Sequence, residues 1–328
     1  MQNMKCGLLC NGPGDVFSRE ETNAMRGLWC LIVVLVHIPA AYQNRIQDML
    51  GSFAYIGVSF FFMTSGFGLM LGVEKNGAEK LNGFWKRRLP KLLIPMAITN
   101  VLTMVMTFAE TGKLDWFQLI GITGFVRQLL LFYLVFWAAC QLASRFVAPS
   151  YRKRVLYGAV ALLILVVYAA SFVLTIPLWP VESVGFLLGM LLAQYRNEVR
   201  AFLGKKWMIK CVVACIASAI LGLMYIKMKH IVFLGDYIVR ILLNICIQAF
   251  VLCVNYKVSV VNVLTKFLGK ISYEVYLLHS VVFSFLMILP VTFGSWTFII
   301  VSMMMAVLLS AFVEIISGRI NKHFFRKK

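Results

Sequence analysis

Residues 26–37 read Arg-Gly-Leu-Trp-Cys-Leu-Ile-Val-Val-Leu-Val-His, and the almost wholly apolar run between Arg26 and His37 predicts a first membrane-spanning helix. At 100° per residue, the eleven steps from Arg26 to His37 make three turns plus about 20°, so both side chains lie on one face, about 16 Å apart along the axis. A titratable imidazole deep in the hydrocarbon is costly and therefore indicates a functional site. The alternative is a structural His37 bonded to a backbone carbonyl, with Arg26 as an ordinary flanking anchor.

The composition is that of a membrane protein. Of the 328 residues, 61% are hydrophobic and 14% are charged, and the mean hydropathy is +0.85. These apolar stretches are too many and too long for polar surface to cover them. A formal net charge of +19 is also found in nucleic-acid-binding proteins, but here the basic residues lie in short loops between apolar runs. No nucleic-acid partner is therefore expected.

The eight cysteines follow neither a metal nor a disulfide spacing. Six of them fall inside apolar segments, where cysteine behaves as a small hydrophobe. Cys6 and Cys10 lie in the N-terminal tail, where lipidation, reactivity and no role at all are open alternatives. Neither a metal site nor a removable signal peptide is expected.

A pass for long apolar runs predicts an all-α polytopic fold of about ten transmembrane helices in one bundle. The predicted segments are Leu28–Ala41, Phe53–Val73, Leu92–Phe108, Phe117–Leu142, Val155–Leu174, Val181–Tyr195, Trp207–Tyr225, Tyr237–Val254, Ile271–Leu289 and Trp296–Ile316. The expected organisation is a tail over 1–25, a membrane domain over 26–317 and a basic tail over 318–328. Neither half of the chain mirrors the other, which weakens the interpretation as an inverted-repeat transporter.

The distribution of basic residues predicts the orientation of the bundle. Of the 32 Lys and Arg residues, 26 fall in the set of loops that includes both termini, five fall in the opposite set, and Arg127 lies inside the fourth segment. Because cytoplasmic loops are enriched in Lys and Arg, both termini are expected in the cytoplasm. An odd number of helices would place the termini on opposite sides and break this alternation.

A basic stretch precedes the third segment. Residues 84–95 read Phe-Trp-Lys-Arg-Arg-Leu-Pro-Lys-Leu-Leu-Ile-Pro, with four cations within six residues at the start of a helix. Helix N-termini and clustered guanidinium groups bind phosphates, so a cytoplasmic donor with phosphate groups would fit here. The alternative is a topology signal with contacts to anionic lipids.

Two further segments carry polar groups. In the second segment, the small residues Gly57, Ser65, Gly66 and Gly68 favour close helix packing, although Ser65 and Thr64 are also placed to line a polar tunnel. In the ninth segment, three polar residues recur at i, i+4 and i+7 and should point into the bundle. They are Ser272, Tyr276 and His279. Mutual structural bonding and the lining of a cavity remain alternatives for these three.

The order and spacing of these motifs resemble the acyltransferase 3 family of integral membrane acyltransferases, which have about ten helices. The resemblance covers about residues 20–317 and rests on four ordered motifs. They are 26–37, 60–67 (Phe-Phe-Phe-Met-Thr-Ser-Gly-Phe), 86–95 and 272–279 (Ser-Tyr-Glu-Val-Tyr-Leu-Leu-His). Residues 132–136 and 185–190 look like two weaker signatures of the same family.

The resemblance implies transfer of an acyl group, usually acetyl from acetyl-CoA, to a hydroxyl of a cell-surface or exported glycan at the plasma or inner membrane. It implies that His37 is the essential base and that Arg26 is the first-helix arginine of the family. The family's Arg-x-x-Arg donor-phosphate motif falls on Arg88-Leu-Pro-Lys91, so lysine holds its second position. Lysine keeps the charge but lacks the bidentate fork of arginine, and Arg87 is placed to share the role.

We therefore expect an acyltransferase that binds the phosphates of acyl-CoA at its cytoplasmic mouth and activates a glycan hydroxyl at His37. The expected donor contacts are Arg26, Arg87, Arg88 and Lys91. Supporting roles, in orientation or oxyanion stabilisation, are expected of Ser65, Tyr276 and His279. No tightly bound cofactor is expected, and Arg127 has no assigned role. The alternatives are a transporter or flippase for a lipid-linked or small anionic molecule and a non-catalytic scaffold.

Overall fold

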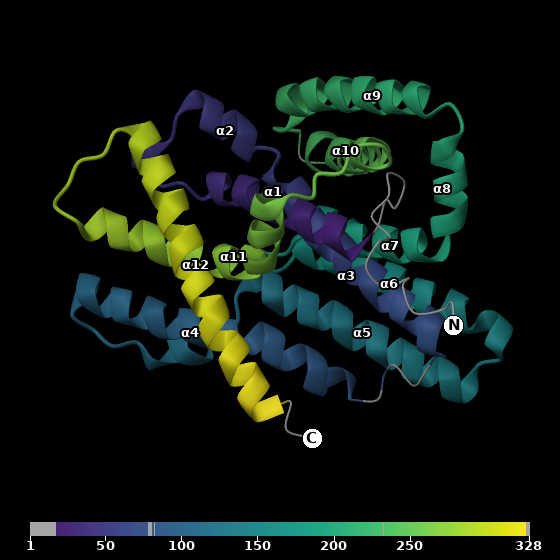
Figure 1. Cartoon of the computed structure of the whole chain (residues 1–328), viewed down its shortest axis with the longest axis horizontal. Helices are drawn as coiled ribbons and strands as arrows, with labels where there is room; N and C mark the ends of the chain where they lie inside the picture. Colours follow the sequence, from purple (N-terminus) through teal and green to yellow (C-terminus); the bar gives the residue numbers. More distant parts are fainter. Residues whose placement is uncertain (1–17, 78–80, 82, 232, 326–328) are drawn as a thin grey trace, which may run out of the picture.

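The computed structural model describes residues 18–77, 81, 83–231 and 233–325, and these residues are almost entirely helical (Figure 1). The α-helices are α1 (Arg19–Val36), α2 (Arg45–Gly51), α3 (Ala54–Asn76), α4 (Phe84–Thr111), α5 (Gly124–Phe146), α6 (Pro149–Ser171), α7 (Pro180–Gln194), α8 (Arg196–Gly204), α9 (Trp207–Met228), α10 (Arg240–Asn255), α11 (Val263–Ile288) and α12 (Ser295–Phe325). Short 3₁₀ segments occur at Ala40–Tyr42 and Trp116–Ile120, and a π-helical turn occurs at Leu234–Val239. Cys6 and Cys10 lie outside the described residues.

Eight helical segments in this part of the chain are long and apolar enough to cross a membrane. The prediction of an all-α, multi-pass membrane protein is thereby confirmed. The first and sixth predicted segments are not among these eight. α1 has 18 residues but includes four charged ones, and α7 is an apolar helix of only 15 residues. Both helices carry a long row of buried side chains, so they lie inside the bundle.

Several predicted boundaries move. α1 ends at Val36 rather than at residue 41, because Pro39 has no N–H to continue the helix and restricts the residue before it. α4 begins at Phe84, so the basic stretch forms the first turns of a helix that continues past Pro90 and Pro95. α1 starts at Arg19 and α12 continues to Phe325, so the expected domain limits at 25 and 317 fall inside helices.

The helices pack around α1 and α3. α1 lies against α3 and α11, and α3 lies along α7. α11 also contacts α4 and α12, and Figure 1 shows α12 crossing α11 and α4. Fully buried phenylalanines join α3, α5 and α7: the Phe62 and Phe132 rings are 5.6 Å apart, and the Phe132 and Phe186 rings are 5.0 Å apart. α9 and α10 form a separate pair beside the π-helical turn.

Two crossings depend on glycine because the backbones touch. On α1, a Cβ at Gly27 would lie 2.6 Å from the backbone nitrogen of Gly269 on α11. On α7, a Cβ at Gly189 would overlap the carbonyl oxygen of Met63 on α3, and a Cβ at Gly66 would overlap the carbonyl oxygen of Phe186. Small residues permit this approach between helices in a membrane. The prediction that small residues of the second segment serve close packing is therefore confirmed at Gly66. It is wrong at Gly68, where an added Cβ would meet nothing within 4 Å.

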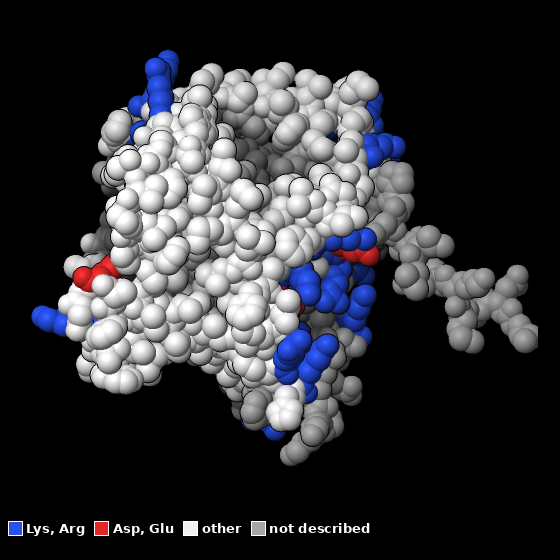
Figure 2. Space-filling model, turned by 60° about the vertical axis from the view of Figure 1, so that its left-hand side comes forward, with Lys and Arg blue, Asp and Glu red and all other residues white. Residues whose placement is uncertain are grey.

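The charged side chains are unevenly distributed over the surface. Figure 2 shows the densest group of Lys and Arg side chains at the lower right of the molecule and smaller groups at its upper right and left edges, whereas most of the face in view is uncharged. Large exposed hydrophobic side chains are numerous on α5, α6, α9 and α12, as a lipid-facing surface requires. The prediction that the basic end faces the cytoplasm rests on the charge count.

Candidate active site

The α1–α11 interface brings together the two polar faces that the sequence suggests separately. Arg26 Nη2 donates to Ser272 Oγ at 3.3 Å, and the rings of His37 and His279 lie 4.7 Å apart between centroids. Cys30, between Arg26 and His37 on the same helix, donates from Sγ to the Ser272 carbonyl at 3.0 Å. The face of α1 that carries Arg26 and His37 is thus the face that meets α11.

Arg26 is held at this interface with unused hydrogen-bonding capacity. Its guanidinium carbon lies 5.4 Å from the centroid of the Phe61 ring on α3. Its Nε is buried and has no hydrogen-bond partner among the described residues. A buried donor without a partner is costly, and an anionic ligand would satisfy it.

The two histidines have the same hydrogen-bond arrangement. Nδ1 of His37 lies 3.0 Å from the Val33 carbonyl oxygen, and Nδ1 of His279 lies 2.6 Å from the Tyr276 carbonyl oxygen. Because a carbonyl oxygen only accepts, Nδ1 carries the hydrogen in both neutral rings, and Nε2 keeps its lone pair. Each imidazole is therefore oriented by the backbone with one nitrogen left to accept a hydrogen bond.

The two histidines differ in burial. His37 follows the last residue of α1, and its side chain is exposed in the protein, whereas His279 is only 6% exposed. The predicted first segment, 28–41, places His37 inside a helix, and this placement is wrong because Pro39 ends α1 early. The depth of His37 in the hydrocarbon stays a prediction. The deeply buried imidazole is instead that of α11, and His37 lies beside it.

The basic stretch at the start of α4 connects to the same region through α5. The guanidinium carbon of Arg88 lies 5.4 Å from the Tyr133 ring centroid, and Nη1 lies 3.5 Å from the tyrosine hydroxyl. That hydroxyl donates to Ser65 Oγ on α3 at 3.4 Å. Ser65 thus lies with Arg88 rather than with His37. Lys91 and Arg87 are exposed on α4.

Arg26 and Arg88 approach neighbouring turns of α3. Arg26 lies over Phe61, and Arg88 reaches Ser65 through Tyr133, so their contacts on α3 are four residues, or about 6 Å of helix, apart. A small cavity of about 30 Å³ lies at the Arg88 end and is lined by Arg87, Arg88 and apolar residues. The two regions of positive charge that the sequence suggests therefore belong to one part of the bundle.

A family model for an acyltransferase domain, of the acyltransferase 3 type, matches residues 19–315. The chain belongs to the acyltransferase 3 family. No curated protein and no solved structure matches it. The matched range begins with α1 and ends within α12, so the family's domain includes every helix described above.

This acyltransferase also contains polar residues that sequence reasoning did not assign to the site. Tyr133 joins Arg88 to Ser65, and the only sequence signal for it is its place in a weak family signature. Glu274 is buried on α11, and its Oε2 has no partner within the described part of the chain. Glu182 forms an ion pair with Arg240 at 2.8 Å, and no pattern in the sequence indicates this pairing.

Tyr276 lies between these groups and the aromatic core of the acyltransferase. Its ring is 6.0 Å from the His279 ring and 5.0 Å, edge to face, from the Phe125 ring on α5. Ser272, Tyr276 and His279 all face neighbouring helices, as the i, i+4, i+7 spacing predicts. Of the predicted supporting residues, Tyr276 and His279 therefore lie with His37.

Proposed function

We propose that the protein is a membrane O-acyltransferase that moves an acyl group, acetyl in the first instance, from cytoplasmic acyl-CoA to a hydroxyl of a cell-surface or exported glycan. Family membership supplies acyl transfer in general. The observation that carries the proposal is the pair formed by His37 and His279, each with Nδ1 bonded to a carbonyl and Nε2 free. Such a nitrogen accepts the proton of an attacking hydroxyl near neutral pH.

The donor end of the proposed site is the basic region of α1 and α4. The phosphates of acyl-CoA contact Arg88, Arg87 and Lys91, and the unpartnered Nε of Arg26 points to a further anion contact. Arg26 and His37 are about 16 Å apart along α1, from the helical rise. The pantetheine arm extends in that direction and carries the thioester toward His37, while the phosphates stay at the basic end.

The chemistry at His37 is general-base catalysis. The glycan hydroxyl gives its proton to Nε2 of His37 while its oxygen attacks the thioester carbonyl carbon. The tetrahedral intermediate then breaks its C–S bond, and the departing CoA thiolate takes the proton back from the His37 imidazolium. Neutral His279 has no N–H left to offer the oxyanion, so we assign it to stabilising the imidazolium. The Tyr276 hydroxyl is a candidate oxyanion donor.

The direct test compares surface glycans from cells with and without the gene by mass spectrometry. We expect each acylated hydroxyl to add the mass of one acyl group, about 42 Da for acetyl. This mass increment should disappear when the gene is removed and return when the gene is restored. The purified protein should release free CoA from acetyl-CoA in the presence of the glycan fraction. Movement of an unmodified molecule across the membrane, without loss of acetyl-CoA, would identify a transporter instead.

Arg88→Ala is expected to raise the KM for acyl-CoA by tenfold or more with little effect on the KM for the acceptor. One charge-assisted hydrogen bond to phosphate is lost, which corresponds to roughly 1.5–3 kcal/mol. The measurement is steady-state kinetics with each substrate varied in turn. Lys86→Ala is the matched control, because Lys86 is an exposed cation of the same helix that does not line the small cavity. Equal effects of the two variants would reduce the basic stretch to a topology signal.

A further inference from the structure

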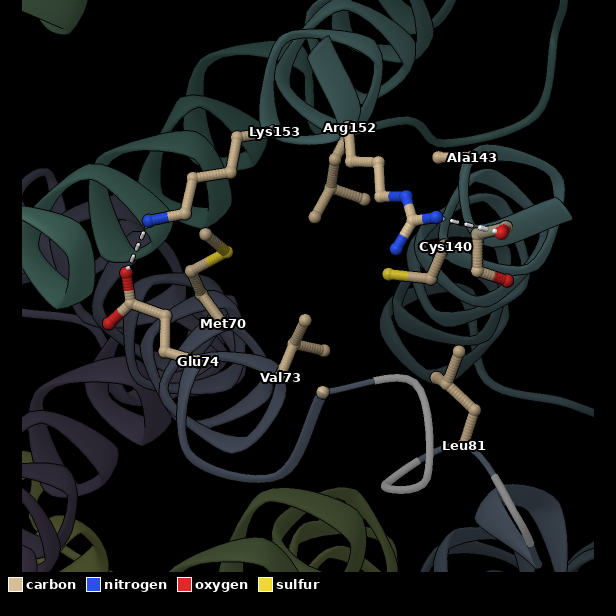
Figure 3. Close-up of a pocket in the computed structure, with 11 residues that line it drawn as sticks. Met70, Val73, Glu74, Leu81, Cys140, Ala143, Arg152 and Lys153 are labelled. Carbon is tan, nitrogen blue, oxygen red and sulfur yellow. Dashed lines mark hydrogen bonds and ion pairs between the residues drawn. The ribbon is translucent and has the colours of Figure 1, made fainter. Parts of the chain in front are cut away.

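A second, larger cavity of about 480 Å³ lies between α3, α5 and α6 (Figure 3). Its walls come from the last turns of α3 and α5, from Leu81 and from the first turns of α6. The small cavity at Arg87 and Arg88 shares Val73 and Leu81 with it, so the two cavities adjoin. The larger cavity thus opens beside the proposed phosphate contacts, on the side away from His37.

The cavity contains a cation that no carboxylate neutralises. Arg152 donates from Nε to the Val147 carbonyl at 3.0 Å and from Nη2 to the Ser144 carbonyl at 3.1 Å. These bonds hold the guanidinium in place but leave its charge uncompensated, and Figure 3 shows its remaining nitrogen directed into the cavity. Within the described part of the chain, no acidic side chain pairs with Arg152. The guanidinium is therefore positioned to bind an anion.

The other charges at the cavity are largely compensated. Lys153 pairs with Glu74 at 3.0 Å, and Arg196 lies 3.7 Å from the other oxygen of the same carboxylate. Glu74 thus has two cations for one negative charge, which leaves a positive excess at the rim. An anionic group would add favourable electrostatics here, whereas a cation would be repelled.

The rest of the wall is largely apolar. The apolar lining comes from Met70, Val73, Leu81, Cys140, Ala143 and Leu156. A volume of about 480 Å³ falls in the range of small-molecule sites. A cavity with apolar walls and one fixed guanidinium fits an organic phosphate in which a heteroaromatic ring lies close to the phosphate.

The distance between the two cavities indicates which ligand could occupy both. On α3, the cavity begins at Met70, five residues from Ser65, and extends to Gly77, so it starts about 7.5 Å of helix beyond the Arg88–Tyr133–Ser65 contact. A ligand that fills both cavities must therefore carry phosphate at two separated places. The nucleotide end of coenzyme A does so, with a pyrophosphate on one side of the ribose and a 3′-phosphate on the other.

We propose that this cavity binds the 3′-phosphoadenosine end of acyl-CoA, with the 3′-phosphate on Arg152 and the adenine against the apolar wall. The inference rests on the proposed function, which places the pyrophosphate at Arg87 and Arg88. Arg152 is then a specificity-determining residue that distinguishes acyl-CoA from donors without a 3′-phosphate.

The test removes the charge from the protein and from the ligand in turn. Acetyl-CoA and 3′-dephospho-acetyl-CoA are compared as donors for the wild type, Arg152→Gln and Arg154→Gln. The wild type should lose about tenfold in kcat/KM when the 3′-phosphate is absent. Arg152→Gln should lose about as much with acetyl-CoA and should no longer distinguish the two donors. Arg154 is an exposed cation on the same helix that lies over Tyr151 and does not line the cavity, so Arg154→Gln should behave as the wild type does.

Binding of adenosine 3′,5′-bisphosphate to the purified full-length protein provides a readout that does not depend on turnover. We expect measurable affinity in the wild type and in Arg154→Gln, and about tenfold weaker binding in Arg152→Gln. Transfer from both donors without discrimination, or equal binding by all three proteins, would overturn the inference and leave the proposed function intact. Absence of transfer from acetyl-CoA together with Arg152-dependent bisphosphate binding would overturn the proposed function instead.

An anionic lipid shares the phosphate chemistry, so the same proteins are compared in nanodiscs with and without phosphatidylglycerol. The inference expects equal thermal stabilisation of Arg152→Gln and Arg154→Gln by this lipid. If phosphatidylglycerol stabilises the wild type and Arg154→Gln but not Arg152→Gln, and the bisphosphate does not bind, the cavity is a lipid site and the inference is wrong.

Discussion

His37→Gln is expected to reduce acyl transfer by about 10²- to 10⁴-fold, the usual contribution of a general base. Glutamine is close in size and still forms hydrogen bonds, but its amide does not accept a proton near neutral pH. The loss should appear in kcat, because the proposed contacts with the phosphates of acyl-CoA lie at the opposite end of α1. The measurement is the rate of acyl transfer from acetyl-CoA by the purified protein, alongside its affinity for CoA.

Two histidine variants make this result specific. His230→Gln is the matched control, because His230 is exposed after α9 and lies outside the site, and it should retain full activity. His279→Gln should give a smaller loss than His37→Gln, since a glutamine stabilises the imidazolium less well than a second imidazole but leaves the base in place. Normal glycan acylation by His37→Gln at wild-type protein levels would remove His37 from the mechanism.

Gly66→Ala is expected to destabilise the folded protein by about 3 kcal/mol, at the upper end of the usual cost of overpacking. The added methyl group would overlap the carbonyl oxygen of Phe186 on α7. A backbone oxygen has no rotamer to change, so α3 and α7 must separate along their whole contact. The measurement is the thermal unfolding midpoint in a fixed detergent, together with the yield of monodisperse protein.

The chain offers a control two residues away on the same helix. A Cβ at Gly68 would meet nothing within 4 Å, so Gly68→Ala should be neutral or should stabilise the helix by roughly 0.5–1 kcal/mol. Because Gly68 lines the small cavity beside Arg88, the Gly68→Ala variant is compared by its thermal unfolding midpoint and not by its activity. Equal unfolding midpoints for Gly66→Ala and Gly68→Ala would mean that the α3–α7 crossing does not require glycine.

The sequence was informative where one helix is enough to place a residue. The spacing of Arg26 and His37 predicted a shared face on α1, and the i, i+4, i+7 spacing predicted an inward face on α11. Both follow from the fixed 100° per residue of an α-helix, which needs no knowledge of the neighbours. The burial of His37 could not be predicted in this way, because it depends on where α1 ends and on which helices extend past that end.

The sequence by itself determined that the chain is a helical membrane protein, where most of its long helices lie and which family it belongs to. Apolar length, helical periodicity and motif order are properties of the order of residues along the chain, so they can be read without knowing which helices are in contact. Only the tertiary structure decided that the α1 face meets the α11 face, that Tyr133 joins Arg88 to Ser65, and that a cavity forms beside them. Those relations depend on which helices cross and on how closely they approach. Packing between residues far apart in the chain, such as Gly66 with Phe186, decides both.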